Sequence, residues 1–207
     1  MSFWHGEATE ISWKLLQDLR KEYDFVLIGG WAVWLYTRAL KSKDIDVLVD
    51  YDVLEKMKRD QPVVKNERLR KYEYRQGMVD VDIYVPHYSD LGLPVKYLME
   101  RTRMLEGFRV PEPELLLILK QRAAEGREGS LKGEKDRIDI VALLASGAVS
   151  LRRYAEVCDE RGLHDLKDRL RSLVAGSRSE FEALGIRDLR RARLMKEGFL
   201  RELGGQP

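Results

Sequence analysis

Two aspartates separated by a single residue, Asp44 and Asp46, have the side-chain type and spacing best suited to chemistry in this sequence. Apolar residues alternate with them at Ile45, Val47 and Val49, a pattern that predicts a strand. Because side chains alternate between the two faces of a strand, both carboxylates are expected on the same face. Such a pair can share divalent cations, since Mg²⁺ prefers oxygen ligands and commonly takes one or two carboxylates plus substrate phosphates.

A third carboxylate is expected from a later strand. The segments Arg70–Arg75 and Met78–Val85 predict a hairpin with a turn at Gln76-Gly77. Asp80 and Asp82 alternate with apolar residues on the second strand, so one or both can face the same side as the first pair. Cations held by three acids would activate an attacking hydroxyl and neutralise a leaving pyrophosphate. The acids therefore indicate transfer at phosphorus with Mg²⁺ or Mn²⁺.

A glycine pair, Gly29 and Gly30, lies between two expected elements. The apolar run Phe25–Ile28 predicts a buried strand, and Trp31–Leu40 predicts the helix that follows it. The missing side chains let a phosphate approach the backbone, where the N-terminus of the helix offers N–H groups. A tight connection between strand and helix explains the same glycines, and the two explanations are compatible.

The elements that must position these residues indicate an α+β fold. A helix over about Glu7–Glu22 is expected to cover the sheet, and Trp31 and Trp34 are expected in the core rather than stacked on a base. Gly107–Val110 is expected as an edge strand before the segment Pro111–Pro113. We therefore expect a mixed-sheet core with flanking helices over residues 1–110.

No strand pattern recurs in the second region, residues 111–207, which is expected to be helical. Glycine-containing breaks separate the apolar patterns in this region. The predicted helices are Glu114–Glu125, Lys132–Ser146, Ser150–Arg161, His164–Ala175 and Ser179–Arg201.

Composition limits the classes of protein. The 37 Lys+Arg and 35 Asp+Glu nearly cancel, so any basic binding surface must be local. The single cysteine, Cys158, excludes an internal disulfide and fits a reducing compartment, where we expect it to be packed. His5, His87 and His164 lack the spacing of zinc ligands. No segment approaches the roughly 20 apolar residues that cross a bilayer, so a cytoplasmic protein without a membrane partner is expected.

Three segments carry a resemblance to a known family: FVLIGGWAV at 25–33, KSKDIDVLV at 41–49 and VDIYV at 81–85. Together they resemble the polymerase-beta-type nucleotidyltransferase superfamily, particularly its small AbiEii-like and MenT-like branch. The pattern of that family is an apolar strand, Gly-Gly or Gly-Ser, a helix, Asp-x-Asp and a further Asp on a following strand. The resemblance implies a metal-dependent enzyme that moves a nucleoside monophosphate from a nucleoside triphosphate (NTP) to an acceptor hydroxyl.

The same resemblance implies roles for individual residues. Asp82 is favoured over Asp80 as the third acid, because the acid of the family directly precedes an apolar stretch such as Ile-Tyr-Val. The other implied roles are phosphate contact by Gly29 and Gly30 and the binding of both metal ions by Asp44 and Asp46.

Nucleotide contacts are also expected just before the first acids. Relatives carry Arg and Thr there, whereas this chain has Leu40 and Ser42. Ser42 and Lys43 are expected to bind the nucleotide, with the missing positive charge supplied by Arg38, Lys41 or Lys43.

The resemblance continues more loosely into the second region, as far as Ser150. VPEPELLLILKQRA, which begins at Val110, and KDRIDI, which begins at Lys135, are similar to helices of the same branch. This resemblance implies that Lys120 and Lys135 reach the phosphates or the base of the nucleotide. From the residues alone, Lys120 is expected on a helix flank, and Lys135 and Asp136 in a solvated first turn.

The acceptor is the least determined part of the hypothesis. The resemblance includes toxin-type enzymes that act on tRNA, which implies an RNA acceptor and an antitoxin protein as partner. An acceptor on a protein side chain or a small molecule is an alternative, and so is a non-catalytic nucleotide-binding module of the same fold. One dense basic run favours RNA, although a solvated helix face is its ordinary explanation: Arg187, Arg190, Arg191, Arg193 and Lys196.

Overall fold

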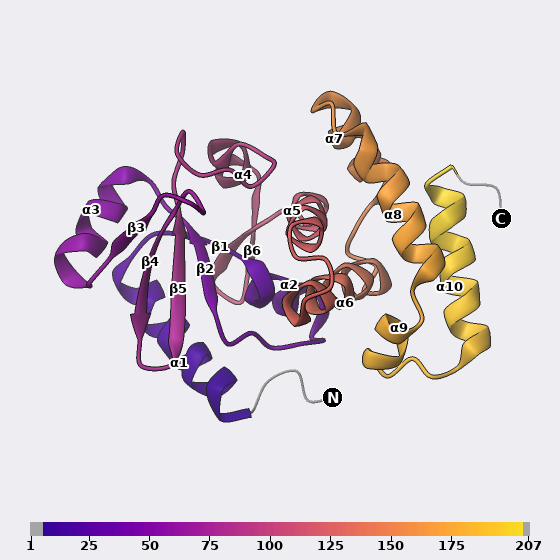
Figure 1. Ribbon diagram of the computed structural model, residues 1–207, viewed down its shortest axis with the longest axis horizontal. Helices are drawn as coiled ribbons and strands as arrows, with labels where there is room; N and C mark the ends of the chain where they lie inside the picture. Colours follow the sequence, from indigo (N-terminus) through magenta and orange to yellow (C-terminus); the bar gives the residue numbers. More distant parts are fainter. Residues whose placement is uncertain (1–5, 205–207) are drawn as a thin grey trace. The chain divides into compact units, whose positions relative to one another are not determined.

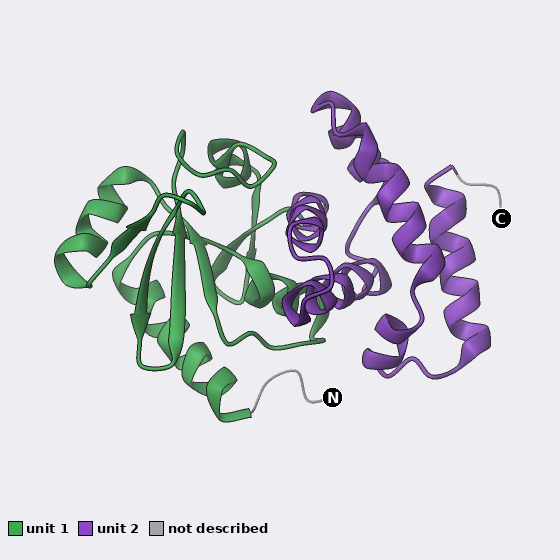
Figure 2. Ribbon diagram, viewed as in Figure 1, with its two compact units in different colours: residues 1–112 green, residues 113–207 purple. Residues whose placement is uncertain are grey.

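The computed structural model describes residues 6–204, so His5 lies outside the described part of the chain. The chain forms two compact units, residues 1–112 and 113–207 (Figure 2). The boundary expected from the sequence, after residue 110, falls just before this division. Pro111 is still the last residue of a strand, and Pro113 is the first residue of a helix.

The first unit is built on a seven-stranded mixed sheet (Figure 1). Its strand order is β3-β4-β5-β2-β1-β7-β6, so strands distant in the sequence meet at the centre. The strands are β1 (Val26–Ile28), β2 (Ile45–Leu48), β3 (Val64–Asn66), β4 (Lys71–Gln76), β5 (Val79–Tyr84), β6 (Thr102–Leu105) and β7 (Phe108–Pro111).

The centre of the sheet is the parallel pair β2 and β5, with β1 antiparallel on the other side of β2. Val47, Val81 and Ile83 are fully buried on one face of these strands. The alternating pattern places Asp46 and Asp82 on the opposite face, whereas Asp44 lies just before β2.

Helices cover the apolar face and the strand ends of this unit. In α1, Leu16 and Leu19 are buried, and the helix packs against β5. Trp31 is fully buried and donates a hydrogen bond from Nε1 to the hydroxyl of Ser12, 2.9 Å away, so its expected place in the core is confirmed. The helices of the unit are α1 (Gly6–Glu22), α2 (Gly29–Thr37), α3 (Tyr51–Asp60) and α4 (Val95–Glu100).

The prediction that the last strand lies at a sheet edge is wrong. β7 pairs with β1 on one side and with β6 on the other, and β6 forms the edge. The sequence pattern of β6 is weak because it is short and its Met104 is exposed. Glu106 and Gly107, both with positive φ, make the tight turn that joins β6 to β7.

The second unit is helical throughout residues 113–204, as predicted, which confirms an α+β fold with a mixed-sheet core and a helical C-terminal region. The single helix expected over Ser179–Arg201 is instead two helices. Gly185 adopts a positive φ of 76° between them, and the carboxylate of Asp188 accepts hydrogen bonds from the first N–H groups of the second helix. The helices are α5 (Pro113–Glu125), α6 (Leu131–Ala145), α7 (Leu151–Glu160), α8 (His164–Gly176), α9 (Ser179–Ala183) and α10 (Leu189–Glu202).

Two expectations from composition concern membranes and cysteine. Within residues 6–204, every helix is too short or too polar to cross a membrane. Cys158 is a free thiol on α7 and is fully buried, so its expected packing is confirmed. Burial raises the pKa of this thiol.

Candidate active site

A row of carboxylates crosses three neighbouring strands on the acidic face of the first unit. The register pairs Asp46 of β2 with Asp82 of β5, and Asp82 with Glu73 of β4. Residues paired in this way lie side by side and project from the same face of a sheet. The row therefore concentrates negative charge along one line of the sheet.

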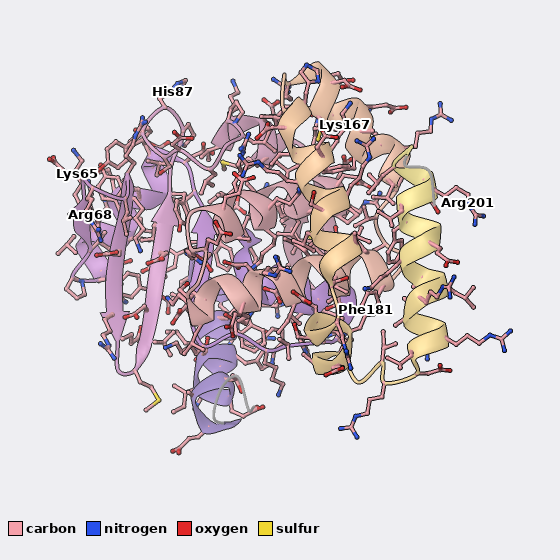
Figure 3. All side chains as sticks on the ribbon, turned by 45° about the vertical axis from the view of Figure 1, so that its right-hand side comes forward. Lys65, Arg68, His87, Lys167, Phe181 and Arg201 are labelled. Atoms are coloured by element: carbon pink, nitrogen blue, oxygen red, sulfur yellow. The ribbon has the colours of Figure 1, made fainter. Side chains whose placement is uncertain are left out.

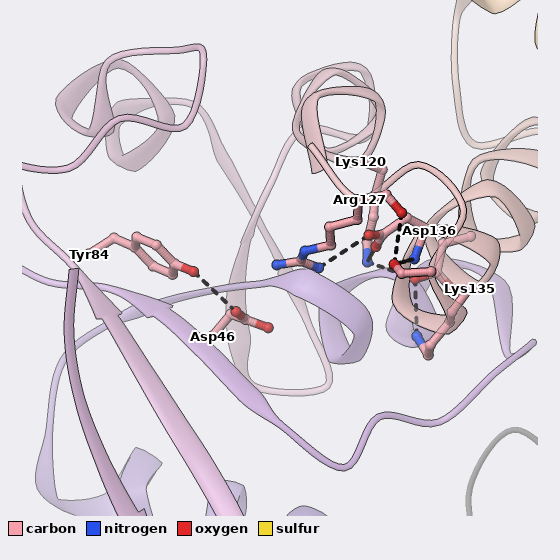
Figure 4. Close-up of polar contacts among 9 residues, drawn as sticks. Asp46, Tyr84, Lys120, Arg127, Lys135 and Asp136 are labelled. Atoms are coloured by element: carbon pink, nitrogen blue, oxygen red, sulfur yellow. Dashed lines mark hydrogen bonds and ion pairs between the residues drawn. The ribbon is translucent and has the colours of Figure 1, made fainter. Parts of the chain in front are cut away.

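Gly29 makes room for the carboxylate of Asp46. A Cβ atom at Gly29 would overlap Oδ2 of Asp46 and would lie 2.7 Å from its Cγ. Gly29 also has a φ of +66°, a conformation that side chains rarely adopt. The hydroxyl of Tyr84 lies 3.5 Å from Oδ1 of the same carboxylate (Figure 4). The first glycine of the pair thus has a local function, which is to admit Asp46 beside the N-terminus of α2.

Lys71, at the start of β4, provides the positive charge beside the row. Its ammonium lies 2.6 Å from Oδ2 of Asp82 and 2.8 Å from Oε2 of Glu73. The side chain of Lys71 is only 11% exposed and that of Asp82 only 18% exposed. A nearly buried ammonium at this distance offsets much of the repulsion between the neighbouring carboxylates.

The pKa values reflect this arrangement. Burial and the nearby charge of Asp46 raise the pKa of Asp82 to about 6, although the ammonium of Lys71 acts in the opposite direction. The hydrogen bond from Lys71 lowers the pKa of Glu73. Burial lowers the pKa of Lys71, but its contacts with Asp82 and Glu73 outweigh burial and raise the pKa overall.

The structure separates the two candidates for the third acid. Asp80 is paired with Arg75 across the hairpin, is 52% exposed, and has a distance of 3.6 Å to the guanidinium. Asp82 lies beside Asp46 in the register. Asp44 is in the bend that directly precedes β2 and is partly buried, two residues before Asp46.

The segment before β2 holds the residues expected to contact the nucleotide. Ser42 is buried and Lys43 is partly buried. Arg38 forms an ion pair with Glu106, and Lys41 forms one with Glu10. Arg38 and Lys41, two of the candidates to replace the arginine of the relatives, are therefore already paired on the surface. The nucleotide contacts of Ser42 and Lys43 stay predictions.

The donor set can be tested for its fit to a metal ion. Among residues 6–204, no group of three or more His, Cys, Asp or Glu side chains is gathered closely enough to hold an ion by itself. Asp46 and Asp82 nevertheless supply hard oxygen donors from adjacent strands. This pair fits an ion of the Mg²⁺ type, which usually takes one or two carboxylates and completes its coordination with phosphates and water.

In the second unit, Lys120 belongs to a buried ionic cluster between α5 and α6. Its ammonium lies 2.8 Å from Oδ1 of Asp136 and 2.7 Å from Oδ2 of Asp139 (Figure 4). Lys135 approaches Asp139 at 3.1 Å, and Arg127 approaches Asp136 at 3.2 Å. These carboxylates raise the pKa of Lys120 despite its burial.

The expectation of a solvated first turn for Lys135 and Asp136 is wrong, because this turn of α6 packs against α5 and both residues are buried. Lys120 is also buried rather than on a helix flank. Its paired carboxylates account for its charge without a ligand, so its contact with a nucleotide stays a prediction.

Sequence reasoning missed Lys71, Glu73 and Tyr84. A turn at Gln76-Gly77 would place Glu73 opposite Asp80, but the observed turn at Gly77-Met78 places Glu73 opposite Asp82. A shift of one residue in the turn therefore hid the partner of the third acid.

The basic run near the C-terminus lies on and just before α10. Arg187, Arg190 and Arg191 are exposed, whereas Arg193 is paired with Glu197 at 2.7 Å. Arg201 also projects from α10 (Figure 3). Lys196 donates a hydrogen bond to the carbonyl oxygen of Ala175, 3.3 Å away. Three arginines therefore make most of the exposed positive charge at the start of this helix.

Solved structures of other proteins are similar to this chain, and one of them, JHP933, shares its fold. JHP933 from Helicobacter pylori superposes with a TM-score of 0.50 at 18% identity, over 97% of this chain and 93% of that chain. An antigenic nucleotidyltransferase-like protein from Paracoccidioides brasiliensis has a TM-score of 0.44 at 19% identity, over 79% and 92%. The Megavirus polyadenylate synthase has a TM-score of 0.46 at 14% identity, over 69% and 32%. No family model and no curated protein matches the sequence.

Proposed function

We propose that this chain is a metal-dependent nucleotidyltransferase that moves a nucleoside monophosphate from an NTP to an acceptor hydroxyl and releases pyrophosphate. One observation carries the proposal: the register places Asp82 beside Asp46, and Gly29 opens the backbone at the same point. Like charges side by side are costly unless a cation compensates them. A row of this kind is expected where cations and phosphates bind.

In the proposed reaction, Asp46 and Asp82, with Asp44 as a further predicted ligand, would hold Mg²⁺ or Mn²⁺, which would neutralise the phosphates and activate the acceptor hydroxyl. Gly29 and Gly30 receive the triphosphate at the N-terminus of α2, where backbone N–H groups favour anions. Ser42 and Lys43, from the segment before β2, contact the nucleotide, with Lys120 as a further predicted contact. Asp82, as the third acid, would help to activate the acceptor hydroxyl.

The acceptor that we propose is RNA, with tRNA as the first candidate. The exposed Arg187, Arg190 and Arg191 support this choice, because arginines bind phosphates without a requirement for a base sequence. The proposal extends to a toxin-type enzyme with an antitoxin protein as partner. Growth arrest on expression, relieved by Asp46→Asn, would support the toxin-type role, and normal growth would contradict it.

The enzymatic proposal is tested with labelled NTPs. The protein is incubated with each NTP, Mg²⁺ or Mn²⁺, and either total RNA or total protein, beside Asp46→Asn and Asp82→Asn. Asp80→Asn is the matched control, since Asp80 is on the same strand but pairs with Arg75. We expect label in the RNA with the wild type and the control, and a loss of at least about a hundredfold with either site variant.

Each other outcome has a definite meaning. Label in the protein pool alone would replace RNA with a protein acceptor. Nucleotide binding without label in the RNA, in the protein pool or in the chain itself would favour the non-catalytic module and contradict the proposed enzyme. Equal transfer by wild type and Asp46→Asn would exclude this acid row as the site.

A further inference from the structure

Lys71 differs from the surface lysines of the first unit in having two carboxylate partners inside the acid row. Its ammonium lies between Asp82, at 2.6 Å, and Glu73, at 2.8 Å. Lys65, on the neighbouring strand β3, is 45% exposed (Figure 3), pairs with Glu67 at 3.2 Å and lies over the ring of Tyr88. Lys71 is therefore shielded from solvent and shared between two carboxylates, whereas an ordinary surface ion pair is exposed and contributes little to stability.

The register explains why a cation is needed at this point. Asp46, Asp82 and Glu73 follow one another across β2, β5 and β4, and each neighbouring pair brings two negative charges together. Like charges directly opposite each other destabilise a sheet. Lys71 compensates the two carboxylates on the β4 side of the row, and Asp46 is at the far end.

Glu73 has a second anchor that does not depend on Asp82. The side-chain amide of Asn66 donates a hydrogen bond to Oε1 of Glu73, 3.1 Å away, while Lys71 contacts the other oxygen. Glu73 can therefore keep its place and keep the ammonium if the contact between Lys71 and Asp82 is broken. Lys71 thus has two partners: Asp82, which also belongs to the proposed metal site, and Glu73, which Asn66 holds in place.

We infer that Lys71 is a positioning residue that neutralises Asp82 while no divalent cation is bound and pairs with Glu73 alone when a cation occupies the acid row. The inference rests on the proposed function, since it assumes that Asp46 and Asp82 bind metal. The consequence is competition, because the ammonium of Lys71 and the metal ion would both bind the carboxylate of Asp82. Glu73 is the residue that makes the exchange possible.

Two substitutions are expected to change metal affinity in opposite directions. Lys71→Met removes the competing cation, so Mn²⁺ should bind roughly fivefold to tenfold more tightly. Glu73→Gln removes the alternative partner and leaves Lys71 bound to Asp82, so Mn²⁺ should bind more weakly by about the same factor. Lys71→Arg retains the charge and should bind Mn²⁺ much as the wild type does.

The experiment is a Mn²⁺ titration of the full chain without nucleotide, followed by electron paramagnetic resonance of the free ion. The series contains the wild type, the three variants, Asp46→Asn, and Lys65→Met as the matched surface control, with circular dichroism to check the fold. We expect Lys65→Met to match the wild type. If Lys71→Met does not fold, Glu73→Gln still decides the question, because unchanged affinity in that variant would overturn the inference.

The outcomes separate this inference from the proposed function. Mn²⁺ binding that Asp46→Asn abolishes but Lys71→Met leaves unchanged or weakens would overturn the role of Lys71 and leave the function intact. Binding by Lys71→Met alone would support the competition and remove the support for metal binding by the native chain. Absence of binding in every variant would overturn both.

Discussion

The substitution Gly29→Ala tests whether stability and activity require the observed position of the Asp46 carboxylate. Gly29→Ala brings a Cβ atom into overlap with Asp46 and forces a side chain onto a φ of +66°. We expect the free energy of unfolding to fall by about 2–4 kcal/mol, from backbone strain and from displacement of the carboxylate. Transfer activity should disappear with it. Urea denaturation and the labelled-NTP assay measure the two effects.

Gly77 provides a matched control for this substitution. It has a φ of +61°, but nothing lies within 4 Å of the position that its Cβ would take. Gly77→Ala therefore measures the cost of the backbone conformation alone, about 1–2 kcal/mol, and should leave activity intact. Equal losses of stability and activity in the two variants would show that Gly29 has no special relation to Asp46.

The raised pKa of Asp82 predicts a pH dependence of stability. Burial and Asp46 raise its pKa from 3.8 to about 6, so the folded protein binds more protons than the unfolded chain between these values. The contribution of Asp82 to the free energy of unfolding therefore falls as pH rises through this window. Asp82→Asn lacks this loss, so its stability relative to the wild type should rise by about 1–3 kcal/mol from about pH 4 to pH 7.

Urea denaturation at several pH values, with a chelator present, measures this difference. Asp80→Asn is the control, because Asp80 is exposed and paired with Arg75. A stability difference between wild type and Asp82→Asn that stays constant across the window would contradict the raised pKa.

At the scale of elements, the packing of α5 on α6 depends on buried charges. Lys120 lies within 2.8 Å of two buried carboxylates, Asp136 and Asp139. Lys120→Met leaves these charges undercompensated, so we expect a loss of about 3–5 kcal/mol in the free energy of unfolding of the second unit. Urea denaturation followed by helix content measures it. Arg152→Met is the control and should have no measurable effect, because the side chain of Arg152 is 90% exposed and its ion pair with Glu156 lies on the surface.

The periodicity of the sequence predicts most of the helices and strands, but it does not predict which strands pair in the sheet. The alternation of β2 and β5 and the spacing in α1 indicate these elements because one face of each is buried. β6 was missed because an exposed edge strand needs no apolar face. The split between α9 and α10 depends on Gly185 and on the cap at Asp188, whose local geometry overrides an otherwise continuous helical pattern.

The candidate site shows the same limit. The positions of Asp46 and the glycines are predictable because strand parity and a strand–helix junction follow from local sequence, whereas Asp44 lies just before β2, where parity does not fix its side. The buried pairs of Lys71 and Lys120 are not, because a lysine without an apolar pattern around it is ordinarily a surface residue. Only the register of the hairpin and the packing of α5 on α6 show that their charges are shared.

At the scale of the whole molecule, the exposed arginines near α10 predict salt-dependent binding of the RNA acceptor. Reversing Arg190 and Arg191 to Glu should raise KM for RNA by about tenfold or more and leave KM for the NTP unchanged. The slope of log affinity against log salt should flatten by about 0.7 for each phosphate of single-stranded RNA that the variant no longer neutralises. Steady-state kinetics at several salt concentrations measure both.

Arg152→Glu is the charge-reversal control, since Arg152 is exposed on α7 and already paired with Glu156. A similar effect from this variant would indicate a response to net charge instead of a binding surface at α10. An unchanged KM for RNA in the double variant would remove α10 from the acceptor surface.

The order of strands in the sheet also has a consequence for how the chain folds. A two-residue turn joins β4 to β5, so Lys71 and Asp82 meet through a local hairpin. Asp46 reaches Asp82 only by pairing β2 with β5 across the intervening α3, β3 and β4, which requires a larger loop to close. In pulse-labelled hydrogen exchange during refolding, we expect the β4–β5 amides to be protected before those that join β2 and β5. Protection in the reverse order would contradict this. We therefore expect the ammonium of Lys71 to be in place beside Asp82 before the carboxylate of Asp46 joins the row.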